Sequence, residues 1–239
     1  GGGVYILDVS VPTNPKKLSE ISTQGVVWEI LYQPDTQLLY LAAGTAGLEL
    51  WDTRDPANPV KIGHYDTPGF AYGIAVSGSY AYVADYAAGL RVIDISTPSN
   101  PTEAGYYNTT GNALGVAVSG SYAYVADYGA GLRVIDISTP SNPTEVGYCD
   151  TPGYALGVAV SGSNAYVADG YAGLRVIDIS TPSNPTEVGY CDTPGYALRV
   201  AVSGSYAYVA DDETGLQIYE FLGAGIEKSK DIVSNSTFQ

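Results

Sequence analysis

The chain consists of short apolar segments separated by turns that are rich in glycine, serine and proline. One stretch of the chain contains four such segments, at residues 115–118, 122–126, 132–137 and 145–149. Valine, isoleucine and tyrosine dominate these segments, and no helical period of 3.6 residues is present, so the pattern predicts β-strands. The Ser-Gly-Ser turn at 119–121 supplies a glycine for a tight hairpin, and two prolines stiffen the connection before the last segment.

This four-strand unit is repeated along the chain with a period of 42 residues. The octapeptide Gly-Leu-Arg-Val-Ile-Asp-Ile-Ser begins at residues 89, 131 and 173, and weaker copies begin at residues 3, 47 and 215. Residues 129–170 and 171–212 differ at only 4 of 42 positions, which indicates recent duplication. Four short strands in each unit of this length are typical of a β-propeller blade. We therefore predict an all-β propeller of four-stranded blades.

The strand count predicts how the ring closes. The first strand of the unit occurs five times, which indicates five blades. The last blade lacks a fourth strand, and we expect residues 17–21 to supply it, because a closed ring has no open sheet edge. The strand at residues 4–9 is then surplus, so the alternative is that these blades belong to a ring of six or seven. We assign residues 1–222 to the propeller and residues 223–239 to a polar tail or linker.

The repeated motif resembles a known family. Leu-Arg-Val-Ile-Asp, preceded by Tyr-Val-Ala-Asp and followed by a Pro-x-x-Pro turn, is similar to the LVIVD repeat over residues 3–222. That family contains propeller-like repeat proteins, mostly secreted or on the surface of archaea and bacteria. The resemblance implies the fold and an extracellular or cell-surface location. It implies no particular activity.

The charge and composition of the chain argue against several classes of function. The chain has 25 acidic and 10 basic residues, a formal net charge of −15, which argues against nucleic-acid partners. No apolar run reaches the roughly 18 residues of a membrane span, so we expect no direct membrane insertion by this segment. A single histidine leaves few routes to acid–base catalysis, and no nucleophile-elbow, P-loop or dinucleotide motif is present. We predict that the protein is not an enzyme.

Two sets of carboxylates recur in the repeat. One set follows the second strand of each unit: Asp85, Asp127, Asp169 and Asp211. A ring of carboxylates is a candidate calcium site, but an arginine six residues after three of them favours a structural hairpin pair. The second set lies at the end of the third strand, at residues 8, 52, 94, 136, 178 and 220. We expect it to bind backbone amides of the following turn.

The positions at which near-identical copies differ point to a candidate binding surface. The variable loops map to one predicted face, and their candidate binding residues are Phe70, Tyr86, Tyr128, Tyr154, Tyr171, Tyr196 and Asp212. Exposed tyrosines among aspartates are suited to stacking on a sugar or anchoring a protein partner. Neutral drift of the loops is the alternative interpretation.

Two further features complete the prediction. Glu29 and Arg199 replace the glycine that opens the first strand in the inner copies, so they would form an opposite-charge pair where the two end blades meet. Asn108 and Asn235 begin glycosylation sequons. The leading hypothesis is an extracellular or cell-surface structural or interaction propeller that presents a Tyr/Asp-rich face to a protein or glycan, in a possible surface assembly. The alternatives are a propeller that binds calcium or a small ligand, and an enzyme on a propeller scaffold.

Overall fold

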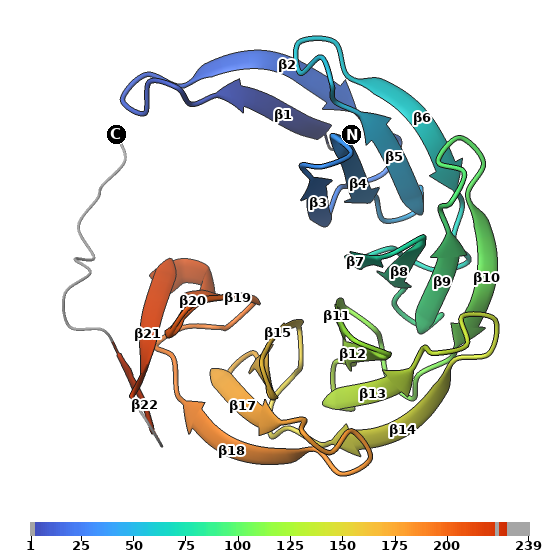
Figure 1. The fold of residues 1–239 in the computed structure, drawn as a ribbon. Coiled ribbons are helices and arrows are strands. Elements are labelled where there is room, and N and C mark those ends of the chain that lie inside the picture. The colour runs from blue at the N-terminus through green and yellow to red at the C-terminus, as the bar shows by residue number, and fades with distance from the viewer. Residues whose placement is uncertain (1–2, 223–224, 229–239) are drawn as a thin grey trace.

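The repeats fold into blades that surround a central channel (Figure 1). The computed structural model describes residues 3–222 and 225–228. In this part of the chain there are five four-stranded antiparallel sheets and one two-stranded sheet. The strands of each blade follow chain order from the channel to the rim, and we name them a, b, c and d. The five four-stranded blades confirm the predicted architecture.

The strand bounds repeat with the sequence period. The a strands, next to the channel, are β3 (Glu29–Gln33), β7 (Gly73–Ser77), β11 (Gly115–Ser119), β15 (Gly157–Ser161) and β19 (Arg199–Ser203). The b strands are β4 (Leu38–Ala42), β8 (Tyr80–Ala84), β12 (Tyr122–Ala126), β16 (Asn164–Ala168) and β20 (Tyr206–Ala210). The c strands are β5 (Leu48–Asp52), β9 (Leu90–Asp94), β13 (Leu132–Asp136), β17 (Leu174–Asp178) and β21 (Leu216–Leu222). The d strands are β6 (Val60–Tyr65), β10 (Thr102–Tyr107), β14 (Thr144–Cys149), β18 (Thr186–Cys191) and β22 (Gly225–Lys228).

The hydrophobic core lies between the blades. One apolar cluster joins Tyr124 and Leu132 of blade 3 to Val167 and Ile177 of blade 4, and the same arrangement recurs at the other junctions. Both faces of an inner blade are therefore covered, which explains why its strands are apolar almost throughout rather than alternating. Each blade depends on its neighbours for its core.

The chain termini form different pairs from the predicted ones. β2 (Lys16–Ser22) pairs with β1 (Gly3–Asp8) and not with blade 5. The fourth strand of blade 5 is β22, which pairs with β21. The prediction that residues 17–21 complete the last blade is therefore wrong. The sequence-adjacent strand is the better partner, because a short connection costs less loop-closure entropy than a pairing across the ring.

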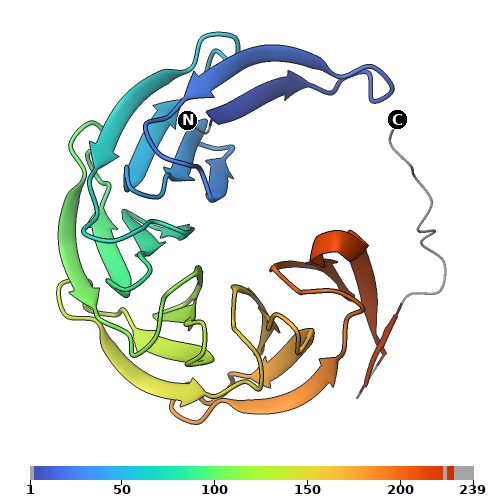
Figure 2. The ribbon, with the colours of Figure 1, turned by 180° about the vertical axis from the view of Figure 1, so that it is seen from behind.

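The described strands leave an opening in the ring between β1–β2 and blade 5 (Figures 1 and 2). Strand β22 lies within the region that the sequence assigned to a polar tail, so the fifth blade reaches Lys228. No helix in residues 3–222 or 225–228 is long and apolar enough to cross a membrane.

Candidate functional site

The aspartates after the b strands hold the inter-blade linkers. Asp127 is completely buried, and its carboxylate accepts hydrogen bonds from Thr109 Oγ1 at 2.6 Å and the Gly111 amide at 2.7 Å. Both donors belong to the linker that enters the same blade from the preceding one. The same threonine and glycine bonds are made by Asp85, Asp169 and Asp211. We call these bonds the linker clamp.

The clamp uses the carboxylates that we considered as calcium ligands. Burial raises the pKa of Asp85, Asp127 and Asp169, and the threonine and glycine hydrogen bonds oppose that rise. Each aspartate belongs to its own blade, and no group of three or more metal-ligating side chains occurs in the described part of the chain. The chemistry of these aspartates is therefore that of a structural clamp.

The predicted arginine partners are also buried rather than exposed. Arg133 is 9% exposed, and its Nε lies 3.9 Å from Asp127 Oδ2, which is too long for a hydrogen bond. Its guanidinium lies 3.7 Å from Glu145 Oε1 and stacks on the Tyr148 ring. Arg91 and Arg175 have the equivalent ion pairs and ring contacts. The arginine thus joins the c strand to the d strand of its own blade.

Five of the six carboxylates in the second set bind a backbone amide of the following turn, as predicted, whereas Glu220 accepts a hydrogen bond from the Tyr206 hydroxyl instead. The Oδ1 atoms of Asp94, Asp136 and Asp178 each accept a 2.8 Å hydrogen bond from the amide two residues later. Hydrogen bonds from the side chain and the amide of the serine two residues later lower the pKa of all three aspartates. They fix the start of the turn between the c and d strands.

Backbone bridges bring the variable loops of adjacent blades together. Tyr128, in the b–c loop of blade 3, exchanges two 3.0 Å hydrogen bonds with Ala155, at the start of blade 4. The same bridge joins Gly44 to Ala71, Tyr86 to Ala113 and Gly170 to Ala197. The b–c loop of one blade and the linker of the next therefore lie side by side on one face, as predicted.

Four of the predicted binding residues form one cluster over blades 3 and 4. The rings of Tyr128 and Tyr154 stack with centroids 4.3 Å apart and planes 4° apart. Tyr171 meets Tyr154 edge-on at 5.4 Å, and its hydroxyl donates a hydrogen bond to the Pro152 carbonyl. Tyr196 lies over Gly170, whose missing side chain leaves room for the ring. Tyr171 is 60% exposed, so the cluster is open to solvent.

A second cluster lies over blades 1 and 2. Tyr72 packs at 5.5 Å from Tyr86, at 6.3 Å from Phe70 and at 4.6 Å from Trp28. Sequence reasoning identified Phe70 and Tyr86 but missed Trp28 and Tyr72. The missed residues occupy the position just before the a strand, where the other copies carry leucine: Leu114, Leu156 and Leu198. An aromatic residue in place of a repeated leucine is the signal that identifies them. We call both clusters together the aromatic surface.

Two tyrosines of the aromatic surface have a strained backbone. Tyr86 and Tyr128 have φ values of 53° and 52°, in the left-handed region that glycine prefers. The equivalent positions in blades 1 and 4 are Gly44 and Gly170. Glycine would thus fit the loop without strain, yet blades 2 and 3 carry large aromatic side chains there.

Asp212 lies apart from the aromatic contacts. It occupies the position of Tyr128 in the last blade and begins η1, the short 3₁₀ turn Asp212–Thr214. Its side chain is exposed, and its φ of 44° is again left-handed. Blade 5 therefore has the same left-handed loop position as blades 2 and 3, but its side chain is not aromatic.

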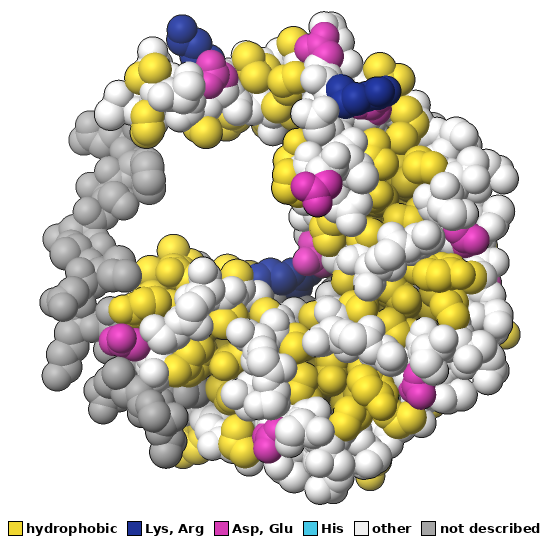
Figure 3. Space-filling view, in the orientation of Figure 1, with side chains coloured by type: hydrophobic (Ala, Val, Ile, Leu, Met, Phe, Trp, Pro, Cys, Tyr) yellow, Lys and Arg dark blue, Asp and Glu magenta, His cyan; other side chains and the backbone are white. Residues whose placement is uncertain are grey.

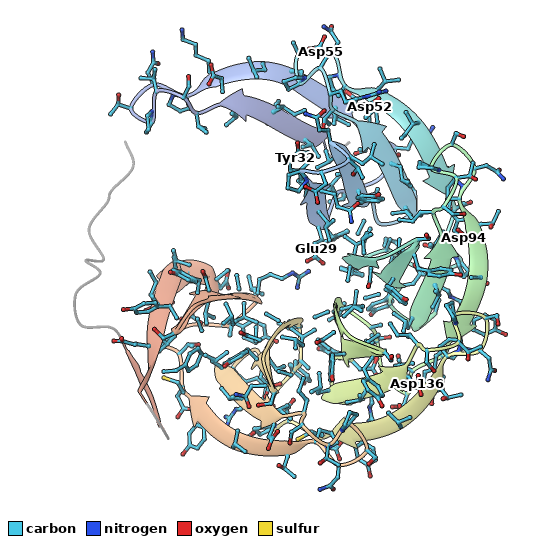
Figure 4. The ribbon with its side chains drawn as sticks, in the orientation of Figure 1. Glu29, Tyr32, Asp52, Asp55, Asp94 and Asp136 are labelled. Carbon is cyan, nitrogen blue, oxygen red and sulfur yellow. The ribbon has the colours of Figure 1, made fainter. Side chains whose placement is uncertain are left out.

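Glu29 and Arg199 lie at the central channel, where Figure 4 shows Glu29 pointing inward. Glu29 Oε2 accepts a 3.0 Å hydrogen bond from the Ile74 amide, and Arg199 Nη1 donates a 2.8 Å bond to the Leu156 carbonyl. Burial raises the pKa of Glu29, while the Ile74 hydrogen bond and the charge of Arg199 lower it. The two charges interact across the channel, although the ring is not closed between their blades.

On the face of the ring that Figure 3 shows, acidic side chains are scattered singly among hydrophobic ones, and charged side chains line the channel. Asn108 of the first sequon is exposed. Asn235 of the second lies outside the described residues.

Solved structures similar to this chain share its fold at low sequence identity. A protein of unknown function from Desulfotomaculum acetoxidans has a TM-score of 0.71 and 15% identity, covering 90% of this chain and 72% of that one. A chain of the mitotic checkpoint complex has a TM-score of 0.73 and 12% identity, covering 95% of this chain and 70% of that one. The computationally designed Ika8 protein has a TM-score of 0.70 and 9% identity, with 92% of this chain covered; this chain spans only 65% of Ika8.

The family of this chain is shown more clearly than its relationship to any individual protein. Comparison with curated proteins finds no match. The model of the LVIVD repeat matches residues 68–109, 110–151, 152–193 and 194–219. These four consecutive matches cover more than half of the chain and coincide with its blades, so the chain belongs to the LVIVD repeat family.

Proposed function

We propose that this protein is a non-enzymatic interaction propeller, extracellular or on the cell surface, whose aromatic surface binds a protein or glycan partner. The observation that supports it best is the pair of strained tyrosines. Left-handed backbone at a non-glycine residue costs on the order of 1–2 kcal/mol, and strained residues of this kind cluster at functional sites. Tyr86 and Tyr128 persist where glycine would relieve that strain, and both carry partly exposed rings.

The chemistry of the surface suits contact through flat apolar faces. Tyrosine and tryptophan dominate the energetics of protein interfaces, because their rings bury large areas at little cost in conformational entropy. The same ring faces stack on the apolar faces of sugars. The clamp carboxylates are buried and therefore do not contact a partner directly. Recognition then rests on the aromatic rings, the tyrosine hydroxyls and backbone groups.

The extracellular location is supported by the family and by the exposed sequon at Asn108. A possible surface assembly would place the aromatic surface against another component of the cell envelope.

The experiment is a binding screen with fold-neutral variants. The intact chain is tested by tryptophan fluorescence and calorimetry against a panel of soluble oligosaccharides, and by pull-down against solubilised surface proteins. The variant carries Tyr86→Gly and Tyr128→Gly together. The matched control carries Val60→Thr and Val188→Thr, because these apolar residues are exposed on the outer strands β6 and β18.

We expect a partner whose affinity falls at least tenfold in the first variant and is unchanged in the control. Equal binding by both variants would show that the partner binds elsewhere. No binding to either panel would overturn the proposed function.

A further inference from the structure

The inner half of blade 1 exposes residues that are buried in the other blades. Ile30 on β3 is 50% exposed, whereas its equivalents Ile74 and Val116 are 3% and 6% exposed. Ile74 is covered by the preceding blade, whose Tyr40 and Leu48 belong to the same apolar cluster. The surface around Ile30 is therefore one side of a blade–blade interface that lacks the inner strands of its partner.

The two-stranded sheet β1–β2 is the outer half of such a partner blade. Its register shift falls between Ile6 and Leu7, which matches the shift between Val134 and Ile135 in blade 3. Val4 and Ile21 pack on Leu39 and Leu41 of blade 1, as c and d strands do at the other junctions. β1 and β2 thus occupy the c and d positions, and the a and b positions are open.

The edge of β1 that faces the open positions has no paired strand in the described part of the chain. Two of its side chains, Tyr5 and Leu7, are 61% and 49% exposed. An unpaired edge next to an apolar surface is suited to the addition of a strand. A whole blade does not fit, because β1 and β2 already cover the outer half of the interface.

We propose that this site binds a two-stranded β-hairpin with the sequence pattern of the chain's own a and b strands. The b strand of the hairpin pairs with β1, and its a strand covers Ile30. The register follows from blade 3, where residues 122–126 oppose residues 132–136. By the same register, the b strand opposes Val4 through Asp8. The tyrosine and the alanines of the added b strand would cover Ile30 in the same way as Tyr40 and Ala42 of blade 1 cover Ile74 of blade 2.

A chimera tests the proposal on the full chain. Residues 113–128 are copied in front of Gly1, which preserves the natural spacing, because Gly3 corresponds to Gly131. We expect the melting temperature to rise by about 5 °C or more and the amides of β1 to exchange at least tenfold more slowly. The control chimera carries Ala117→Glu and Tyr124→Glu in the copied segment only, because the equivalent residues of blade 2, Ala75 and Tyr82, pack on the following blade. Equal melting of the two chimeras would overturn the proposal.

A synthetic peptide of residues 113–128 tests the location of the site in trans. We expect it to bind the unmodified chain and to slow amide exchange in β1. Ile30→Glu is expected to weaken this binding at least tenfold, whereas Val188→Glu, at an exposed position on the outer strand β18, leaves it unchanged. Binding that is insensitive to Ile30→Glu would place the peptide elsewhere and overturn the proposed site.

Discussion

Tyr128 and Tyr154 come from adjacent blades, yet their rings stack in parallel with centroids 4.3 Å apart. The stack crosses the junction at which Tyr128 also exchanges backbone hydrogen bonds with Ala155. The position of the rings is therefore set by the junction between the blades, and the aromatic surface has the rigidity of the propeller rather than that of a free loop.

Replacing Tyr128 by glycine separates binding from stability. The change removes a ring stack worth about 0.5–1.5 kcal/mol and relieves left-handed strain of about 1–2 kcal/mol. We expect the free energy of unfolding to stay within about 1 kcal/mol of the unmodified chain, as measured by urea titration. A loss above about 3 kcal/mol would mean that this tyrosine has a structural role.

The linker clamp predicts a large loss of stability on Asp127→Ala. The change removes both acceptor oxygens, so the Thr109 hydroxyl and the Gly111 amide lose their buried partner. We expect a loss of about 2–3 kcal/mol in thermal or urea unfolding. The partner change Thr109→Val should cost less, about 1–2 kcal/mol, because it removes a single neutral donor. A neutral outcome for Asp127→Ala would contradict the clamp.

Glu29→Gln gives a pH-dependent effect. The folded-state pKa of Glu29 is raised, so ionisation of this carboxyl destabilises the fold as the pH rises through that pKa. Glutamine stays neutral, and it can still accept the hydrogen bond from Ile74. We expect the variant to be more stable than the unmodified chain at pH 7. The difference should shrink as the pH falls from the raised pKa of Glu29 to the ordinary range of glutamate, and it should be absent below that range, as measured by melting temperature from pH 3 to 7.

A difference of opposite sign, or one that is constant with pH, would contradict this prediction. It would mean that the attraction of Arg199 outweighs the cost of burying the Glu29 carboxylate.

The glycines that open the a strands predict a packing effect at the channel. A methyl group on Gly115 would lie 3.1 Å from Gly157 Cα and 3.2 Å from the Leu156 carbonyl oxygen, both rigid backbone atoms. We expect Gly115→Ala to cost about 1–3 kcal/mol in urea unfolding. Gly129→Ala is the control, since its methyl group would meet only the Tyr154 ring at 4.0 Å and Ala87 occupies the same position in blade 2. Equal effects of the two changes would contradict tight packing at the channel.

The repeat predicted the blades because each unit carries its strands, turns and prolines in the same order. The sequence could not predict the partner of β2, because the c strands β1 and β21 have the same sequence pattern. Only the spatial arrangement shows that β2 pairs with β1. The clamp was partly visible: the aspartates were identified, but their threonine donors lie 18 residues earlier in a linker. Trp28 and Tyr72 were missed because they interrupt a repeated leucine rather than a variable loop.

The 18-residue span of the clamp has an evolutionary consequence. Thr109, Gly111 and Asp127 all lie within one 42-residue unit, so a gene duplication that copies the unit also copies the complete clamp. Recombination between such nearly identical segments can then lengthen or shorten the chain by whole units without any compensating substitution. New recognition arises separately, by point changes in the loops, so the size of the scaffold and the identity of its surface can evolve independently.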